Sequence, residues 1–447
     1  MPVLFKSVLA LVLTLVLCLP ARAQSQSISL IRDTEIETTI RAYATPVFLA
    51  AGLDPSSVRI YLVNDRQINA FVAGGQNLFI NTGLLVQSEN AGQVIGVIAH
   101  ETGHIAGGHL IRVQEAQKRG TAESILAFVL GTAAAAAGRP DVGAAVMSGG
   151  QNIALRNYLQ YSRTQEGSAD AAAMKFLDET HQSAQGLLDF MQILSNQELL
   201  APARQDPYLR THPLSQDRIE ALADFVAKSP YSKVPVSPAL ERQHQRMVAK
   251  LRAFLDEPGM TMRRYPESDQ SDEALYARAI AAHRAADSKK SIVLIDQLLA
   301  HHPDDPYYYE LKGQVLFESG HPLEAVGPYT TAVRLLPDAP LLRLDLARCQ
   351  LATNDPKMLP SAIENLQVSL AIEPNRPFVW RQLAIATGRN GQEAESSLAL
   401  AEEAMLLNKP AEAKFHAGQA EHLLPTGSPN WLKAQDIIAA VDQAREE

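Results

Sequence analysis

The order of apolar and polar positions divides the chain into a mixed N-terminal region and a helical C-terminal region. Within residues 28–56 apolar residues recur at helical spacing, and Val58–Val63 then alternates with a period of two, which predicts a helix followed by a strand. Asn69–Val72 and Asn77–Asn81 lie on either side of a Gly-Gly turn, which predicts two more strands. The N-terminal region is therefore expected to hold a small sheet among helices.

Two longer helices are predicted after these strands, one over about residues 90–117 and one over about residues 153–178. Residues 121–138, which lie between them, carry no charge from Ser124 to Ala137 but are too short to span a bilayer comfortably. Two interpretations of this segment stay open. It is either a packed, alanine-rich helix or a flap that covers a site or touches a membrane.

The C-terminal region repeats itself. His302-Pro-Asp-Asp-Pro306 recurs 34 residues later as Leu336-Pro-Asp-Ala-Pro340, and again 37 residues later as Glu373-Pro-Asn-Arg-Pro377. This period is typical of tetratricopeptide repeats, in which each helix pair buries its apolar face by stacking on its neighbours. Residues 306–339 fit best, and Asn354-Asp-Pro-Lys357 lengthens the next repeat. A plain helical bundle is the alternative.

The N-terminal stretch has the three parts of a secretory signal peptide. Lys6 supplies a positive charge, residues 7–19 are apolar, and Ala21-Arg22-Ala23 offers a small-residue cleavage site, so removal of residues 1–23 is predicted. A retained membrane anchor and a lipoprotein modified at Cys18 are the alternatives. After cleavage Cys349 would be the one remaining cysteine, which excludes an internal disulfide. This combination is typical of a bacterial periplasmic protein.

The net charge and the positions of the prolines indicate the kind of partner and the domain boundaries. The formal net charge is −9, and cleavage would leave 38 basic against 49 acidic residues, a net charge of −11. No nucleic-acid partner is therefore expected. Prolines and serines gather in residues 227–240, which suggests a domain boundary there. The predicted segments are an N-terminal domain at 24–230, a helical linker at 231–270 and a repeat domain at 271–447.

The candidate chemistry lies in the stretch VIAHETGHIAGGHL of the first long helix. Residues four apart share one face of a helix, so His100 and His104 can direct both imidazoles at one ion. With Glu101 they form the H-E-x-x-H pattern of zinc hydrolases, and one Zn²⁺ per chain is predicted. Zinc lowers the pKa of bound water to about 7, and Glu101 would act as the general base. Hydrogen-bonded core histidines are the alternative.

A third metal ligand is required. The continuation found in metzincins would place a histidine at position 110, where this chain has Leu110, and His109 is off the ligand face and is expected to be solvated or to lie behind a ligand. The second long helix offers Glu166 and Asp170, again four residues apart. Glu166 is the predicted ligand, and Asp170 would hydrogen-bond a ligand histidine. The small residues of 167–173 would allow the two helices to pack closely.

A loop histidine is the last candidate. His212 precedes a proline, which favours an extended backbone, and Ser215 could cap a helix that starts at about Gln216. His212 could stabilise the transition state, occupy the open position of the metal, or have no role. Arg210 and Arg218 are weaker candidates for balancing charge near the site.

Together, His-Glu-Thr-Gly-His at 100–104, Glu-Gly-Ser-Ala-Asp at 166–170 and Thr-His-Pro-Leu-Ser at 211–215 resemble the gluzincin group that includes the CAAX prenyl proteases. With a signal peptide and C-terminal repeats, the chain is similar to the periplasmic beta-barrel assembly-enhancing proteases. The resemblance implies His100, His104 and Glu166 as zinc ligands, Glu101 as base and His212 as a switchable fourth ligand. It also implies that Asn77–Asn81 is an edge strand that pairs with extended substrates.

The expected fold is α+β and mostly helical: a gluzincin-type zinc metallopeptidase domain with a small sheet, followed by an all-α tetratricopeptide-repeat array. The expected function is a periplasmic endopeptidase that degrades misassembled or stalled outer-membrane proteins. Extended or unfolded proteins would be its substrates, the outer-membrane barrel-assembly machinery would bind the repeats, and peripheral membrane contact is possible. The alternative is a chaperone or assembly adaptor with a latent or structural zinc site.

Overall fold

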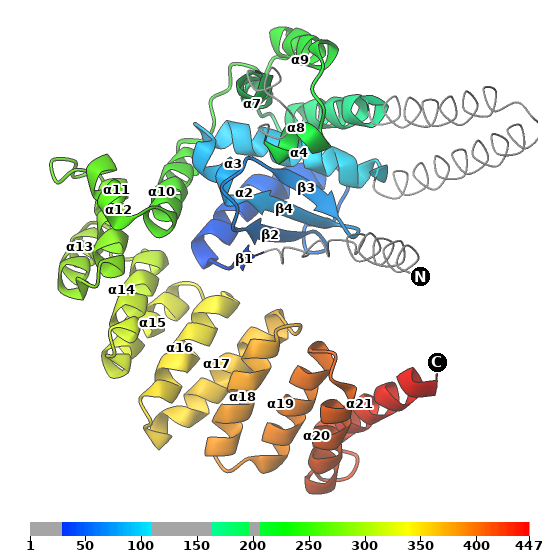
Figure 1. The fold of residues 1–447 in the computed structure, drawn as a ribbon, viewed down its shortest axis with the longest axis vertical. Helices are drawn as coiled ribbons and strands as arrows, with labels where there is room; N and C mark the ends of the chain where they lie inside the picture. Colours follow the sequence, from blue (N-terminus) through cyan, green and yellow to red (C-terminus); the bar gives the residue numbers. More distant parts are fainter. Residues whose placement is uncertain (1–28, 110–162, 196–205, 447) are drawn as a thin grey trace, which may run out of the picture.

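The computed structural model describes residues 29–109, 163–195 and 206–446 of the chain. An N-terminal part that combines helices with a small sheet is followed by a row of paired helices (Figure 1). The predicted signal peptide and the apolar segment 121–138 lie outside the described residues. Within the described ranges, no helix is both long enough and apolar enough to cross a membrane.

The sheet has four strands in the order β1-β2-β4-β3. Its strands are β1 (Leu30–Ile31), β2 (Arg59–Val63), β3 (Ala70–Ala73) and β4 (Asn77–Asn81). β4 pairs in parallel with β2 and antiparallel with β3, whereas β1 pairs antiparallel with β2. The hairpin between β3 and β4 turns at Gly74 and Gly75, whose positive φ angles of 56° and 93° favour glycine.

The expectation that Asn77–Asn81 is an edge strand is wrong, because β4 lies between β2 and β3. β2 occupies the hydrogen-bonding edge of β4 on which a substrate would have paired. The two strands pair in parallel from Arg59 opposite Asn77 to Val63 opposite Asn81. The strand at this edge is β3 instead (Figure 1).

The predicted helix at residues 28–56 begins later than expected. Its first residues form β1, and α2 (Thr34–Ala50) starts only after Asp33, whose side chain accepts a hydrogen bond of 2.9 Å from the amide of Ile36. At the N-terminal end of this segment, the chain pairs with β2 as a strand although its apolar residues have helical spacing.

The remaining helices of the N-terminal part surround the site described below. They are α3 (Thr82–Gln87), α4 (Ala91–Ala106), a helix at residues 163–179, α7 (Gln185–Ser195), α8 (Pro207–Thr211) and α9 (Gln216–Lys228). α4 ends at Ala106, and the chain turns at Gly107 and Gly108, where Gly108 adopts a positive φ of 62°. Residues 110–117 of the predicted helix lie outside the described residues. The helix at 163–179 ends close to its predicted end.

The two long helices approach each other closely at one glycine. A β-carbon on Gly103 of α4 would lie 2.7 Å from the carbonyl oxygen of Ala169, so only glycine allows this approach. Close packing through small residues was expected, but Gly167 and Ser168 do not contribute to it, because both are exposed. Ala169 and Ala172, which belong to the same predicted set, make the contact.

Two further helices connect the N-terminal part to the array. They are α10 (Pro238–Leu255) and α11 (Pro258–Arg264). One side of α10 places Met247 and Leu251 in the core of the N-terminal part, and another side places Ala249 and Ala253 in the first core of the array. The predicted helical linker is therefore packed into both parts and is not a free spacer.

The described array contains five helix pairs in sequence order (Figure 1). They are α12 (Asp272–Arg284) with α13 (Ser288–His301), α14 (Pro306–Glu318) with α15 (Pro322–Leu335), α16 (Pro340–Ala352) with α17 (Leu359–Ile372), α18 (Pro377–Arg389) with α19 (Glu393–Leu406), and α20 (Pro410–Leu423) with α21 (Pro429–Glu446). The second proline of each recurring motif is the first residue of a helix, where proline is favoured. The lengthened repeat holds a 3₁₀ turn, η2 (Pro356–Met358).

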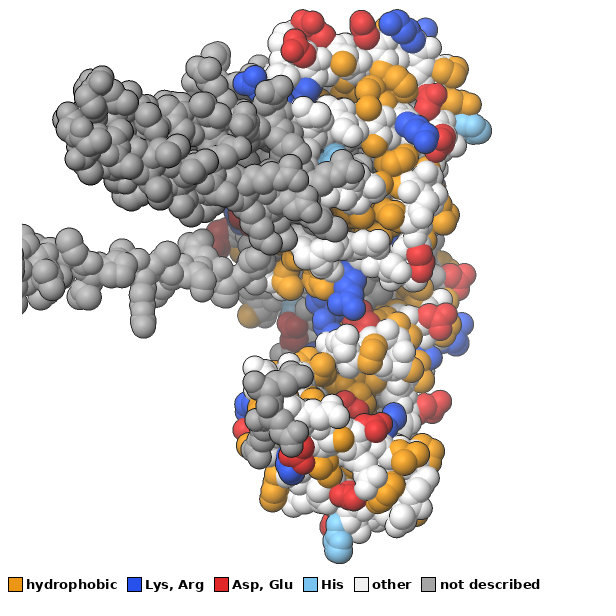
Figure 2. All heavy atoms as spheres, turned by 90° about the vertical axis from the view of Figure 1, so that its right-hand side faces the viewer, with side chains coloured by type: hydrophobic (Ala, Val, Ile, Leu, Met, Phe, Trp, Pro, Cys, Tyr) orange, Lys and Arg blue, Asp and Glu red, His pale blue; other side chains and the backbone are white. Residues whose placement is uncertain are grey.

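A buried ionic network joins the array to the N-terminal part. Lys250 of α10, only 4% exposed, places Nζ 2.7 Å from a carboxylate oxygen of Asp33 and 3.1 Å from one of Glu35. Tyr276 of α12 donates a 2.8 Å hydrogen bond to Glu35. Farther along, Arg32 lies 2.7 Å from Glu373 at the end of α17. On the face shown in Figure 2, acidic and basic side chains are interspersed and form no continuous basic surface.

Candidate metal centre

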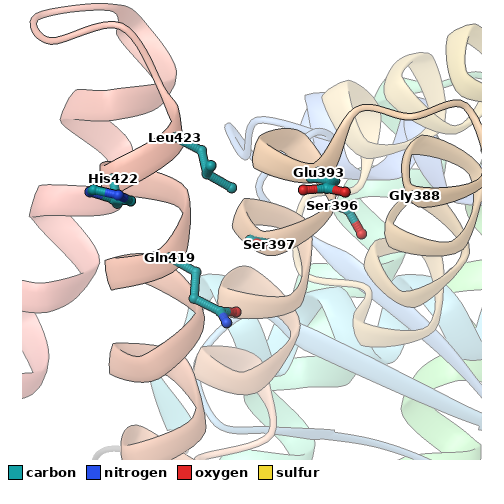
Figure 3. Close-up of a pocket in the computed structure, with 7 residues that line it drawn as sticks. All are labelled: Gly388, Glu393, Ser396, Ser397, Gln419, His422 and Leu423. Atoms are coloured by element: carbon teal, nitrogen blue, oxygen red, sulfur yellow. The ribbon is translucent and has the colours of Figure 1, made fainter.

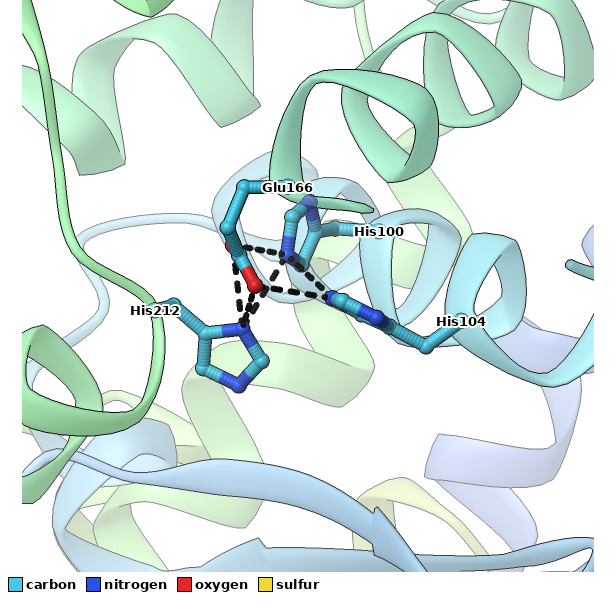
Figure 4. Close-up of side chains that lie close together, drawn as sticks. All are labelled: His100, His104, Glu166 and His212. Atoms are coloured by element: carbon cyan, nitrogen blue, oxygen red, sulfur yellow. Dashed lines mark hydrogen bonds and ion pairs between the residues drawn. The ribbon is translucent and has the colours of Figure 1, made fainter. Parts of the chain in front are cut away.

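Two helices bring four of the predicted residues together. The one-turn spacing on α4 places Nε2 of His100 and Nε2 of His104 only 3.1 Å apart. Glu166 of the helix at 163–179 points its carboxylate between them, 3.3 Å from His100 Nε2 and 3.4 Å from His104 Nε2 (Figure 4). Asp170, one turn further, lies behind His100. All four side chains are buried.

His212 supplies a fourth donor atom. It caps the C-terminal end of α8, and its Nδ1 lies 3.4 Å from His100 Nε2 and 3.2 Å from Glu166 (Figure 4). We refer to His100, His104, Glu166 and His212 as the metal cluster. Within the described part of the chain, it is the one group of three or more such side chains that could hold a metal ion.

The cluster fits a tetrahedral cation in spacing and in charge. An ion with bonds of about 2.0–2.1 Å separates its ligand atoms by about 3.3 Å. Five of the six pairs of residues in the cluster have donor atoms 3.1–3.4 Å apart, and all four donor atoms lie within 4.8 Å of one another. The buried carboxylates of Glu101, Glu166 and Asp170 face one buried guanidinium, that of Arg218. A divalent cation would balance the two negative charges that remain when all three carboxylates are ionised.

Asp170 and Arg218 fix the first histidine. Oδ1 of Asp170 lies 2.8 Å from Nδ1 of His100, and Arg218 binds the same carboxylate through two nitrogens at 2.6 and 2.9 Å. Burial by itself would raise the pKa of Asp170, but the hydrogen bonds from Arg218 and His100 outweigh it and lower the pKa to about 2. Asp170 is therefore ionised and keeps the proton of His100 on Nδ1, so that Nε2 can face an ion. Arg218 also lies 3.1 Å from Glu166.

The electrostatics around His100 and His104 differ. Burial would lower the pKa of His100, but hydrogen bonds with Asp170 and Glu166 raise it to about 10, so the cluster favours a positive charge at this point. Burial and the charges of His100 and His212 lower the pKa of His104 to about 2. A neutral His104 next to a site that attracts positive charge is the form that binds a metal.

His109 lies behind His104. The two Nδ1 atoms are 3.0 Å apart, and His109 is only 3% exposed. The expectation that it lies behind a ligand fits this position, whereas the alternative of a solvated side chain is wrong. Since one of the two nitrogens must donate to the other, His109 can fix the ring orientation of His104.

Glu101 lies beside the metal cluster and is fully buried. No described group donates a hydrogen bond to either of its carboxylate oxygens, and the nearest nitrogen, Nε2 of His212, is 3.4 Å away. Burial raises the pKa of Glu101. An acid in this environment accepts a proton more readily than a solvated one.

The sequence reasoning missed Tyr208, which covers His212. The two rings stack at 4.6 Å, and Phe190 of α7 packs edge-on against Tyr208 at 5.4 Å. The Tyr208 hydroxyl is buried and has no hydrogen-bond partner among the described residues. The four-residue spacing between Tyr208 and His212 could have indicated the contact. The side chain of Arg210, another candidate, lies outside what the structure describes.

A separate hollow of about 430 Å³ lies between α19 and α20 in the array (Figure 3). Its lining includes Glu393, Gln419 and His422. These side chains do not form a group that could hold a metal, so the hollow is not a second centre of the same kind.

Comparison with known proteins agrees with this geometry. Residues 31–226 match the model of peptidase family M48. They form an M48 peptidase domain with an intact His–His–Glu metal site, and the chain is therefore a metallopeptidase with a tetratricopeptide-like helical array.

The similarity to two curated relatives extends beyond this domain. The beta-barrel assembly-enhancing protease of Yersinia pestis is 26% identical over 433 residues, which is 95% of this chain and 86% of that protein. The protein of the same name from Escherichia coli (strain K12) is 25% identical over 94% of this chain and 85% of its own length.

Metalloprotease YcaL of Escherichia coli (strain K12) is 25% identical over 173 residues, 39% of this chain and 63% of that protein. Among solved structures, YrrB, a TPR protein with an unusual peptide-binding site, is 15% identical, covers 39% of this chain and 91% of its own, and has a TM-score of 0.33.

Proposed function

We propose that this chain is a zinc-dependent endopeptidase of the periplasm that degrades misassembled or stalled outer-membrane proteins. The observation that carries the peptidase part is the convergence of four donor atoms within 4.8 Å of one another, beside the buried carboxylate of Glu101, to which no described group donates a hydrogen bond. Two relatives that align with 95% and 94% of this chain are named beta-barrel assembly-enhancing proteases, which supports a role with barrel-forming proteins. The predicted signal peptide supports the compartment.

In this proposal His100, His104 and Glu166 hold the ion, and Asp170 orients His100. A bound zinc ion supplies Lewis-acid chemistry that polarises a peptide carbonyl and makes water more acidic. Glu101 takes the proton of the attacking water and returns it to the leaving amine. Burial of the site keeps bulk water away from these charges, which strengthens their interactions.

His212 occupies the position that water would need. Its Nδ1 lies 3.4 Å from Nε2 of His100 and 3.2 Å from the carboxylate of Glu166, and Tyr208 stacks on its ring. We infer a latent enzyme in which the segment carrying Tyr208 and His212 must move before a substrate can bind. The edge of β3 that no described strand pairs with would then pair with an extended protein chain. The repeat array would bind the barrel-assembly machinery.

A second candidate function deserves a test because four protein donors fill a tetrahedral set, as they do in structural zinc sites. In that case the chain would act mainly as a chaperone or assembly adaptor. Glu101 favours the peptidase, since a structural site does not need a buried base.

The deciding experiment uses Glu101→Gln, with Glu89→Gln at an exposed position as control. Glu101→Gln should keep about one zinc per chain and lose digestion of casein by about 10²–10⁴-fold, whereas the control should digest normally. Unchanged digestion would refute the assigned base. In cells that lack the native protein, full rescue of outer-membrane defects by Glu101→Gln would favour the adaptor.

A further inference from the structure

Three aromatic rings cross the sheet from β2 to its edge. Tyr61 of β2, Phe79 of β4 and Phe71 of β3 are directly opposite one another in the strand register. Tyr61 and Phe79 stack with centroids 4.9 Å apart and planes 15° apart, and Phe71 and Phe79 stack at 4.9 Å and 6°. We call these three residues the aromatic ladder.

The aromatic ladder lies on the face of the sheet that points away from the core. On the opposite face, Leu62, Val72, Leu78 and Ile80 are buried in the core with α2 and α4. The three ladder rings are only half-buried. Half-buried stacked aromatics contribute less to the core than rings packed inside it, so packing alone does not account for three of them in one row.

The spacing of the aromatic ladder equals the spacing of strands. Neighbouring strands lie about 4.7–4.9 Å apart, and both ring separations are 4.9 Å. The ladder ends at Phe71 because β3 is the last strand of the sheet. A strand added beside β3 would place one of its own side chains at the next position, one strand spacing beyond Phe71.

The start of β3 meets the segment that carries one member of the metal cluster. Among the described residues, β4 is the only strand that pairs with β3. Ile68, two residues before β3, accepts a hydrogen bond from the amide of Tyr208 and donates one to Asp206, so the segment that carries His212 meets the start of β3. β3 also contacts α4. A chain paired with β3 would therefore lie at the edge of the sheet that adjoins α4 and the segment carrying His212.

We infer that Phe71 is a specificity-determining residue that selects extended substrates with an aromatic side chain at the position opposite it, stacked as the next ring of the aromatic ladder. This inference rests on the proposed endopeptidase function and names its substrate class: segments of β-strand character that carry tyrosine, phenylalanine or tryptophan at alternate positions. Face-to-face stacking favours such a segment over one with aliphatic residues by about 3- to 10-fold in affinity.

The test measures binding separately from cleavage. Two fluorescein-labelled peptides, one alternating threonine with tyrosine and one alternating threonine with leucine, are titrated into the full chain carrying Glu101→Gln and His212→Ala. The second change removes the side chain that is proposed to keep the site closed. The tyrosine peptide should bind about 3- to 10-fold more tightly. Adding Phe71→Leu should remove this preference, and Phe71→Tyr should keep it. Tyr61→Leu removes another half-buried ring, three strands from the added chain, and should leave the preference unchanged.

Equal affinity for the two peptides would overturn the inference, as would a preference that survives Phe71→Leu or a failure of both peptides to bind. Failure of the proposed function would look different. In that case the tyrosine peptide would bind with the expected preference but would not be cleaved by the chain with Glu101 intact.

Discussion

The carboxylate of Asp170 lies 2.8 Å from Nδ1 of His100 and fixes that ring with Nε2 facing the metal cluster. Asp170 stands one helical turn after Glu166, so a single helix supplies both a donor atom and the group that orients another donor. Arg218 binds both carboxylates and joins α9 to the same helix.

Replacing Asp170 should weaken metal binding. Asp170→Asn leaves a hydrogen-bond acceptor for His100 but removes the charge that pairs with Arg218, and loss of such a partner costs about 10–100-fold in metal affinity. Competition with a chromogenic chelator measures the zinc dissociation constant. Asp224→Asn, at a side chain 80% exposed on α9, is the matched control. Equal zinc affinity in Asp170→Asn and the control would show that this carboxylate does not support a ligand.

Replacing His212 should activate the enzyme. His212→Ala removes the fourth donor while His100, His104 and Glu166 can still hold the ion, so basal digestion of casein should rise several-fold with zinc content unchanged. His301→Ala, at a side chain 60% exposed in the array, should have no effect. A fall in activity would instead assign His212 to transition-state stabilisation, and no change would remove it from the site.

Gly103 should be intolerant of any side chain. A β-carbon there would lie 2.7 Å from the carbonyl oxygen of Ala169 and would push the two metal-binding helices apart. Gly103→Ala should therefore lower the free energy of unfolding by about 1–3 kcal/mol and weaken zinc binding. Gly167→Ala, on the second of these helices but with nothing within 4 Å, should be neutral or stabilising by about 0.5–1 kcal/mol. Urea unfolding measures the free energy of unfolding of both variants. A loss of stability in Gly103→Ala alone indicates a steric clash, whereas a loss in both variants indicates that these helices are sensitive to any substitution.

The pH dependence of stability should include a contribution from Glu310 of α14. Burial raises the pKa of Glu310 to about 8 from an ordinary value of 4.5, with Lys250 opposing and the charge of Asp33 adding to the rise. Between these pH values the folded state holds a proton that the unfolded state has released, so stability falls as pH rises from about 4.5 to about 8.

Glu310→Gln should remove this fall and should stabilise the protein relative to wild type at pH 8 more than at pH 5. Urea unfolding at the two pH values measures the difference, and Glu324→Gln, 67% exposed, is the control. A wild-type-like pH dependence in Glu310→Gln would show that its carboxyl group does not titrate in this range.

The helical spacing rules predicted much of the metal centre because they are local. One turn separates His100 from His104 and Glu166 from Asp170, and helix geometry alone fixes which side chains share a face. The recurring prolines likewise marked the helix starts of the array, since proline is favoured at the first helical position. The M48 domain and the tetratricopeptide-like array agree with these expectations.

The strand order could not be predicted because it depends on pairing between distant segments. The hairpin of β3 and β4 is visible in the sequence, but nothing local shows that β2 pairs with β4, which makes β3 the edge. For the same reason the stacking of Tyr208 on His212 and the double contact of Arg218 became apparent only when α8 and α9 were placed against the metal-binding helices.

The most direct test is anomalous X-ray scattering from crystals of the purified full chain, recorded on both sides of the zinc absorption edge. The account predicts one strong zinc peak bonded to Nε2 of His100, Nε2 of His104, the carboxylate of Glu166 and Nδ1 of His212. The absence of a peak between these atoms, or a Glu166 side chain that points away from it, would contradict the assignment of a metal-dependent peptidase.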